Sequence, residues 1–345
     1  MNTHNVGRAV AGLGPHGEAG APIEQLGVSR ECAARAAERA FAVVAVMHTT
    51  GSDWAKQQLA GIEATLARYG ARLIDVIDSD FRPERQIAAL ERLLVERPDA
   101  VIAIPVDNVE TSGAFAMLGP AGIPLVLMDN APAGLLPRKH YASVVSADNF
   151  GNGQVAATML AMYLPDGGEV VIVGYGRDFF SINEREIGFR KLLGDARPDV
   201  RLSRVEFTDI AQAGELLGQS IANGSAPDGI FVVWDDPAMS VVRELRATGL
   251  NIPMTTIDLG NEVALEMARG GLVVGVGAQR PYDQGVAEAL AAIMALCGEE
   301  PPPWVAVPGL AVTRRNVIDA YQRVWHEAAP AELLESARGK GPYWP

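Results

Sequence analysis

Polar side chains follow four short apolar segments of the sequence. Along the chain these are Asp107 and Asn108, then Asp129 and Asn130, then Asp235 and Asp236 after Trp234, and finally Asp258. If the apolar segments are buried parallel strands, their carboxyl ends meet at one edge of a sheet, where open α/β sheets bind ligands. Asp and Asn also favour turns and helix caps, so one such strand end alone carries little weight. Four of them in the same register favour a polar ligand cleft.

Two tryptophans and one arginine could complete such a cleft. Trp54 and Trp234 lie at or just after predicted strand ends, and an indole offers an apolar face for a sugar ring and an N–H donor. Core packing is the alternative for either ring. Arg185 is expected in the first turn of a helix, where its guanidinium could bind hydroxyl oxygens or pair with Asp129 or Asp258. A surface salt bridge is the alternative for Arg185.

Motifs of catalysis and cofactor binding are absent from the sequence. It contains no Gly-x-Ser-x-Gly, His-Glu-x-x-His, Walker A or Gly-x-Gly-x-x-Gly pattern. The five histidines show no metal-ligand spacing, and only His48 falls near the expected cleft. We therefore expect a binding protein and not an enzyme, with no catalytic residues, no metal and no cofactor.

The polar strand ends belong to a regular alternation of strands and helices. In the first half, strands are predicted at 41–47, 72–77, 100–104, 123–128 and 143–146, and helices at 54–69, 83–96 and 109–118. In the second half, strands are predicted at 169–173, 201–207, 229–234, 253–257 and 272–276, and helices at 150–163, 183–193, 211–222, 237–248 and 262–269. This alternation predicts an α/β fold with two doubly wound parallel-sheet lobes.

The two ends of the chain and the segment after the second unit are less regular. Residues 1–28 are rich in Gly, Ala and Pro and are expected to be poorly ordered, before a short helix over 29–40. Later come a helix at 281–298, short returning strands at 305–307 and 310–312, a closing helix at 317–327 and a loop at 339–345.

Composition limits the classes of protein and partner. The chain has 345 residues, enough for two domains, and a net charge of −13, which opposes binding to nucleic acid or anionic membranes. No apolar run reaches the roughly 18–20 residues of a transmembrane helix. The two cysteines, Cys32 and Cys297, are expected to be unpaired structural thiols, without a disulfide framework.

A series of short motifs, in order, resembles the periplasmic sugar-binding proteins of the ribose-binding type, the solute receptors of ABC transporters. The resemblance covers residues 41–326 and rests on motifs that are individually weak but occur in the right order and spacing. The motifs are Gly51-Ser-Asp-Trp54, Ile123-Pro-Leu-Val-Leu-Met-Asp-Asn130, Val144-Val-Ser-Ala-Asp-Asn149, Arg185-Glu-Ile-Gly-Phe189, Phe231-Val-Val-Trp-Asp-Asp236, Thr256-Ile-Asp258 and Gln279 before Pro281-Tyr-Asp-Gln-Gly285.

The resemblance implies two doubly wound lobes of the type I periplasmic-binding fold, joined by a three-stranded hinge, with a monosaccharide or polyol bound between them. The ligand-binding residues that it implies are Ser52, Trp54, Asp129, Asn130, Arg185, Trp234, Asp235, Asp258 and Gln279. Asn130 stands where the ribose pattern has an arginine, and Trp234 where it has an asparagine. These departures favour a differently shaped pentose, a hexose or a polyol over ribose.

The resemblance also implies a domain division, a partner and a location. The N-terminal lobe would comprise 41–146 and about 280–306, and the C-terminal lobe 147–279 and about 307–328, with an extension at 1–40 and a tail at 329–345. The partner would be a membrane permease, and the receptor would be a monomer. The family is periplasmic, but residues 1–22 lack the apolar core of a secretory signal. A genuine start at Met1 would instead imply a cytoplasmic protein.

Two other classes stay open on the sequence. The effector-sensing domain of a LacI-type regulator shares the two-lobed fold, although no helix-turn-helix pattern precedes it here and the charge opposes DNA binding. A sugar-converting enzyme is the third class, but no nucleophile–base pair is visible. A sensor partner of a chemoreceptor or kinase is compatible with the binding interpretation.

Overall fold

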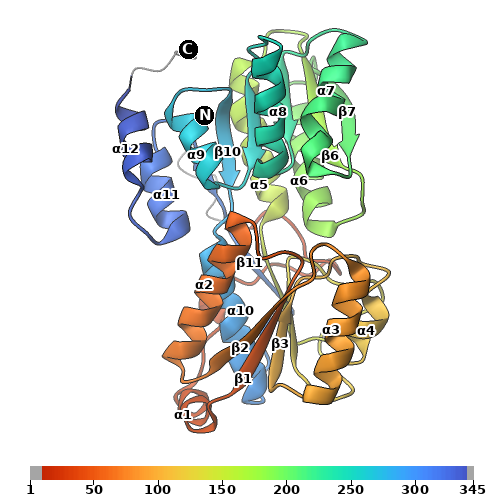
Figure 1. The fold of residues 1–345 in the computed structure, drawn as a ribbon, viewed down its shortest axis with the longest axis vertical. Coiled ribbons are helices and arrows are strands. Elements are labelled where there is room, and N and C mark those ends of the chain that lie inside the picture. Colours follow the sequence, from red (N-terminus) through yellow and green to blue (C-terminus); the bar gives the residue numbers. More distant parts are fainter. Residues whose placement is uncertain (1–9, 340–345) are drawn as a thin grey trace.

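The computed structural model describes residues 10–339, which form two α/β lobes stacked along the long axis of the molecule (Figure 1). Within this range the strands form two six-stranded sheets, one in each lobe. The predicted fold class is confirmed.

The N-terminal lobe is built on a sheet with the strand order β11-β5-β4-β3-β1-β2. Its strands are β1 (Ala42–Met47), β2 (Arg72–Asp78), β3 (Ala100–Ala103), β4 (Leu125–Met128), β5 (Ser143–Ala147) and β11 (Trp304–Val307). The helices of this lobe are α1 (Arg30–Arg39), α2 (Asp53–Arg68), α3 (Pro83–Glu96), α4 (Ser112–Ala116) and α10 (Pro281–Leu296), with a 3-10 turn, η2, at Ile23–Gln25. All strand pairs in this sheet are parallel.

The C-terminal lobe repeats this arrangement with the strand order β12-β10-β9-β8-β6-β7. Its strands are β6 (Glu169–Tyr175), β7 (Arg201–Phe207), β8 (Gly229–Val232), β9 (Met254–Ile257), β10 (Val273–Ala278) and β12 (Leu310–Val312). Its helices are α5 (Asn149–Leu160), α6 (Phe180–Ala196), α7 (Ala213–Ala222), α8 (Asp235–Ala247), α9 (Asn261–Ala268), α11 (Val317–Trp325) and α12 (Ala331–Arg338), with 3-10 turns η3 (Ala161–Tyr163) and η4 (Ile210–Gln212). Only β12 runs antiparallel to its neighbour, β10.

The chain passes between the lobes three times, as the three-stranded hinge requires. It crosses from β5 to α5, from β10 to α10, and from β11 to β12. Because β11 returns to the first sheet and β12 to the second sheet, neither lobe is a continuous segment of the chain.

The apolar segments form the central strands of the sheets, where both faces of each strand are buried. Every residue of β3, β4, β8 and β9 is buried, which explains why these segments show no polar alternation. The edge strands β2 and β7 have mostly exposed residues and correspondingly mixed sequences.

Glycines allow two helix pairs to pack unusually closely, one pair in each lobe. A Cβ at Gly61 of α2 would lie 2.1 Å from the backbone oxygen of Tyr282 in α10, and one at Gly285 the same distance from Gln58. In the other lobe, a Cβ at Gly188 of α6 would lie 2.1 Å from the oxygen of Phe150 in α5. The close approach fixes the helices that begin beside the lobe boundary.

The prediction that the N-terminal segment is poorly ordered is wrong for residues 10–28; residues 1–9 lie outside the described part. Ala21 pairs with β11, donating to Trp304 and accepting from Ala306. The backbone N–H groups of Ala11 and Gly12 donate to the Asp148 carboxylate at 2.7 and 3.0 Å. The segment is ordered because an open edge of the sheet and a carboxylate accept its backbone groups.

The prediction of unpaired cysteines is also wrong. Cys32 in α1 and Cys297 at the end of α10 form a disulfide, with their Cα atoms 5.5 Å apart. The two cysteines are separated by 265 residues in sequence, and only the packing of α1 against α10 brings them together. The bond therefore joins the N-terminal extension to the lobe.

The end of the chain contains more helix than the sequence suggested. Helix α12 follows α11 and packs against α9, with Leu333 buried. Most of the predicted loop over 339–345 lies outside the described residues.

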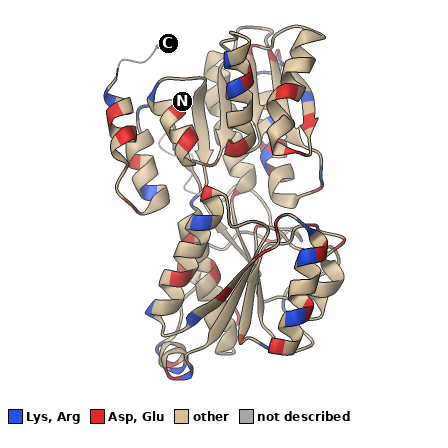
Figure 2. Cartoon of the chain, viewed as in Figure 1, with Lys and Arg blue, Asp and Glu red and all other residues tan. Residues whose placement is uncertain are grey.

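Charged residues are distributed over both lobes. Figure 2 shows Lys and Arg segments interspersed with Asp and Glu along the helices. Within residues 10–339, no helix is both long enough and apolar enough to cross a membrane.

Candidate ligand-binding cleft

A cleft of about 690 Å³ lies between the two lobes. Its wall contains residues that follow β1, β3 and β4 in one lobe and β6, β8 and β9 in the other. Seven of the nine predicted ligand-binding residues line it, namely Ser52, Trp54, Asp129, Arg185, Trp234, Asp235 and Asp258. The carboxyl ends of both sheets thus face each other across one cavity.

Asp129 supplies a carboxylate from the N-terminal lobe. It follows β4 and is 3% exposed, and its Oδ1 accepts a hydrogen bond from Gln284 Nε2 at 3.3 Å. Burial raises the pKa of Asp129 to about 6, although Arg185 across the cleft lowers it in part. A hydroxyl donor from a ligand would replace the water that this carboxylate has lost.

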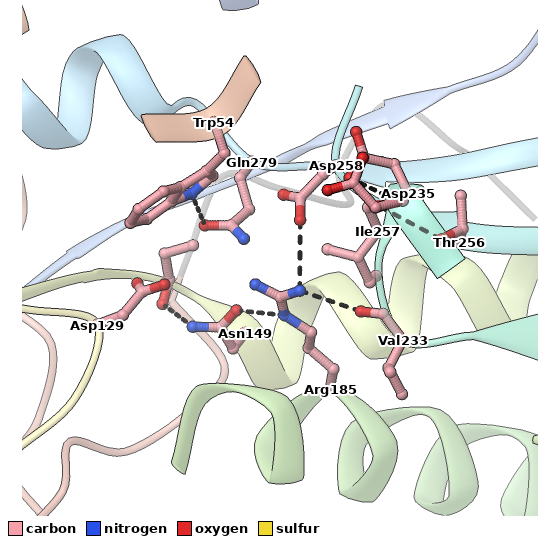
Figure 3. Close-up of polar contacts among 12 residues, drawn as sticks. Trp54, Asp129, Asn149, Arg185, Val233, Asp235, Thr256, Ile257, Asp258 and Gln279 are labelled. Carbon is pink, nitrogen blue, oxygen red and sulfur yellow. Dashed lines mark hydrogen bonds and ion pairs between the residues drawn. The ribbon is translucent and has the colours of Figure 1, made fainter. Parts of the chain in front are cut away.

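Arg185 and Asp258 form a buried ion pair in the C-terminal lobe (Figure 3). The guanidinium Nη1 lies 3.3 Å from Asp258 Oδ2 and also donates to the Val233 carbonyl at 3.0 Å, while Nε donates to Asn149 Oδ1 at 2.9 Å. Burial raises the pKa of Asp258, and the neighbouring Arg185 counteracts this effect. Three fixed acceptors thus orient the guanidinium at the cleft.

Asp235 stands beside Asp258 at the start of α8 (Figure 3). Its carboxylate accepts from the backbone N–H of Gly260 and of Asp236, both at 3.0 Å. Burial and the negative charge of Asp258 raise the pKa of Asp235 well above its ordinary range. This part of the cleft is therefore short of positive charge.

Aromatic rings line both sides of the cleft. Trp234 packs against Tyr175 and Phe207, with ring centroids 5.3 and 5.1 Å apart. In the other lobe, His48 contacts both Trp54 and Phe81 edge to face. Burial lowers the pKa of His48 to about 4, so its imidazole is neutral near pH 7.

The other predicted site residues have structural partners. Ser52 lines the cleft, but its Oγ caps α2 by accepting from Ala55 N–H at 3.2 Å. Asn130 is fully buried and bonds to Asn108, and it does not reach the cleft wall. Gln279 is also behind the wall, where its Oε1 accepts from Trp54 Nε1 at 3.4 Å. Asn130 and Gln279 are therefore buried behind the cleft wall, where each has a protein partner.

The lobes also contact each other directly at the mouth of the cleft. Asp53 Oδ2, at the start of α2, accepts from the backbone N–H and the side-chain amide of Asn261 in α9, at 3.1 and 3.0 Å. On another side, Asn108 Nδ2 lies 3.4 Å from the Asp178 carbonyl. Phe179 of the C-terminal lobe packs against the core of the N-terminal lobe. These contacts join the two lobes directly.

Several lining residues were missed at the sequence level, among them Phe81, Tyr175 and Phe179. Phe81 and Phe179 belong to loops, where an aromatic residue has no periodic pattern to identify it. Tyr175 ends β6, so its position at a strand tip was a signal that could have been used.

The comparison with protein families adds to this geometry. The model of the family described as "periplasmic binding protein domain" matches residues 43–300. The chain belongs to this family. Among curated relatives, the ribose import binding protein of Haemophilus influenzae is 22% identical to this chain over 240 residues. The match covers 70% of this chain and 80% of the relative. The ribose import binding protein of Escherichia coli strain K12 is 21% identical, with 70% and 79% covered.

Solved structures of solute-binding proteins share the fold of this family member. One from Agrobacterium vitis, bound with α-D-tagatopyranose, has a TM-score of 0.74 at 22% identity and covers 81% of this chain and 97% of its own. Another, from Agrobacterium radiobacter in complex with D-arabinose, has a TM-score of 0.74 at 18% identity, covering 82% of this chain and 98% of its own. At these identities the likeness establishes the fold alone.

Proposed function

We propose that this protein is the solute receptor of an ABC importer and captures a monosaccharide or polyol in the interlobe cleft. The observation that carries the proposal is the arrangement of Asp129 from one lobe opposite Arg185 and Asp258 from the other, around one cavity. Carboxylates accept and a guanidinium donates, which suits the hydroxyl groups of a polyol. The named activities of the curated relatives support this choice.

Closure follows from the same geometry. A ligand that contacts Asp129 and Asp258 at once stabilises the closed form, because it bonds to both lobes only when they are together. The Asp53–Asn261 hydrogen bonds form at the same time and add to the closed form. The closed receptor would then be the form that a permease recognises.

The disulfide supports an extracytoplasmic location. Disulfides form and persist in oxidising compartments such as the periplasm, and they are rare in the cytosol. The Cys32–Cys297 bond and the family together favour the periplasm. We further propose a monomeric receptor without a nucleic-acid partner or a cofactor.

The test is a thermal-shift screen of the purified protein against pentoses, hexoses and polyols, followed by calorimetry. A compound that binds the folded state alone raises the unfolding midpoint by mass action. A rise confined to one or two related compounds would support the proposal. A flat response to all of them would contradict it.

A further inference from the structure

The cleft contains many more acidic than basic side chains. Seven carboxylates line it against two guanidinium groups, those of Arg177 and Arg185, and no lysine is among the described lining residues. His48 adds no charge near pH 7, because burial lowers its pKa to about 4. The cleft wall therefore has a large excess of carboxyl groups over basic groups, which a neutral sugar does not balance.

Two of the outer carboxylates, Asp53 and Glu262, have partners of their own. Asp53 accepts from Asn261 and lies 3.5 Å from Lys56 Nζ, and Glu262 lies 3.7 Å from Arg243. The contact with Asn261 and the ion pairs at the surface therefore supply partners for these two carboxylates.

The inner carboxylates are not balanced in this way. Arg185 is the one cation within ion-pair distance of the group formed by Asp129, Asp235 and Asp258 in the described part of the chain, and it contacts Asp258 alone. Three desolvated carboxylates thus share one guanidinium.

Asp258 gives a second and independent indication of a missing donor. Asp258 is 8% exposed and lines the cleft, and its Oδ1 has no hydrogen-bond partner among residues 10–339. A buried carboxylate oxygen without a partner is costly, and a ligand donor would remove that cost. Arg185 Nη1 bonds to Oδ2 and to the Val233 carbonyl, and no nitrogen of Arg185 lies within hydrogen-bond distance of Oδ1.

The missing positive charge is better supplied by an organic cation than by a metal ion. Among the described residues, no group of three or more His, Cys, Asp or Glu side chains is arranged to hold a metal. The wall next to Asp235 is the indole of Trp234, and aromatic faces attract ammonium groups as well as sugar C–H groups.

We propose that the preferred ligand is an amine-bearing sugar or polyol, with its ammonium group held between Asp235 and the free Oδ1 of Asp258. This inference rests on the proposed function and narrows its ligand class. The three hydrogens of the ammonium group can be donated to these two carboxylates, while Asp129 and Arg185 remain available to bind hydroxyl groups of the ligand.

The experiment compares matched pairs of compounds by calorimetry on the full chain. The pairs are amino sugars and amino alditols with the amine at different carbons, such as glucosamine and 1-amino-1-deoxysorbitol, each against its hydroxyl parent. We expect at least one amine to bind at least about tenfold more tightly than its parent, because it pairs with desolvated carboxylates. Trp54 and Trp234 line the cleft and allow a fluorescence readout of the same titration.

Two variants locate the effect. In Asp235→Asn the amide oxygen can still accept from one of the two backbone N–H groups, that of Gly260 or that of Asp236, while the charge is removed. We expect this variant to lose the preference for the amine, so that the amine no longer binds more tightly than its hydroxyl parent. Asp195→Asn is the matched control, since Asp195 pairs with Lys191 on the outer face of α6 and its side chain is 74% exposed. It should keep the preference within about twofold.

The outcomes separate this inference from the proposed function. Neutral sugars or polyols that bind as tightly as every amine would overturn the inference and leave the receptor function standing. An amine preference that survives Asp235→Asn and Asp258→Asn would overturn the assigned position of the ammonium group. Failure of all amines and all neutral compounds to bind would overturn both proposals.

Discussion

Asp129 and Asp258 occupy equivalent positions in the two lobes and face each other across the cleft. Asp129 follows β4 and Asp258 follows β9, and each of these is the fourth strand of its sheet when counted from the edge strand β2 or β7. Both residues have a left-handed backbone, with φ of 55° and 72°. The N–H of each donates to the next strand, to Val145 and to Gly277 respectively. A non-glycine residue at positive φ is strained, and such strain is concentrated at binding sites. The repeated conformation therefore supports a shared role in holding one ligand.

The ion pair between Arg185 and Asp258 leads to the first prediction. Arg185→Ala or Asp258→Ala should weaken ligand binding by at least about 1.5 kcal/mol, since each leaves a buried polar partner unsatisfied. Calorimetry with the ligand found by screening measures the change. Lys191→Ala, on the exposed side of the same helix, is the control and should bind as the unaltered protein does. Unchanged affinity in both cleft variants would remove these residues from the site.

The interlobe contact at Asn261 leads to a second prediction. Asn261 does not line the cleft, but its side chain donates to Asp53 and accepts from the Tyr321 hydroxyl. Asn261→Ala should lower the affinity by about 0.5–1.5 kcal/mol, because a hydrogen bond of the closed form is lost. The exposed Asn251, before β9, provides the control Asn251→Ala. If both variants bind equally well, the contact does not contribute to closure.

The glycine contact between α5 and α6 leads to a third prediction. Gly188→Ala should destabilise the protein by about 1–3 kcal/mol, because the new Cβ would press on the Phe150 backbone. It should also weaken binding, since α6 carries Arg185. Gly194→Ala, on the same helix with open space around it, should instead stabilise the protein by about 0.5–1 kcal/mol. Urea denaturation of the two variants measures the two changes in stability, and calorimetry measures the change in binding. Equal stability of the two variants would argue against close helix packing.

The disulfide leads to a fourth prediction. The double variant Cys32→Ser, Cys297→Ser should lose about 2–5 kcal/mol of stability, because the bond restricts the unfolded chain. A lower thermal midpoint would report this loss. Reductant should lower the midpoint of the unaltered protein towards that of the variant and leave the variant itself unchanged. A reductant effect of the same size in both would mean that the bond is not its cause.

The pKa of Asp129 leads to a prediction on pH. Burial raises this pKa from 3.8 to about 6, so the folded protein holds the proton more tightly than the unfolded chain does. The contribution of Asp129 to the free energy of unfolding is therefore largest below pH 4 and falls as the pH rises through 6. The loss is up to about 3 kcal/mol at 1.36 kcal/mol per pKa unit.

Asp129→Asn removes this loss. The ligand-free variant should be more stable than the unaltered protein at pH 7, and the difference should shrink towards pH 4. Denaturation series at several pH values measure it, with the exposed Asp195→Asn as a control that follows the unaltered protein. A difference that does not vary with pH would show that burial of Asp129 is not the cause.

The sequence alone determined the two-lobed α/β fold and most of the cleft. Runs such as Leu125–Met128 are apolar because both faces of a central parallel strand are covered, so the strands and the polar residues that end them can be recognised locally. Asp129, Arg185 and Asp258 were identified in this way, with the help of the resemblance to sugar receptors.

Only the tertiary structure decided which residues meet across long stretches of chain. The Cys32–Cys297 bond, the Asp53–Asn261 contact and the packing of Phe179 on the other lobe join segments that share no local pattern. The same holds for Asn130, whose type and place suggested a ligand contact but whose side chain points to Asn108 behind the wall. Local sequence encodes burial and backbone preference, whereas the direction of a side chain and its distant partners depend on how complete elements pack.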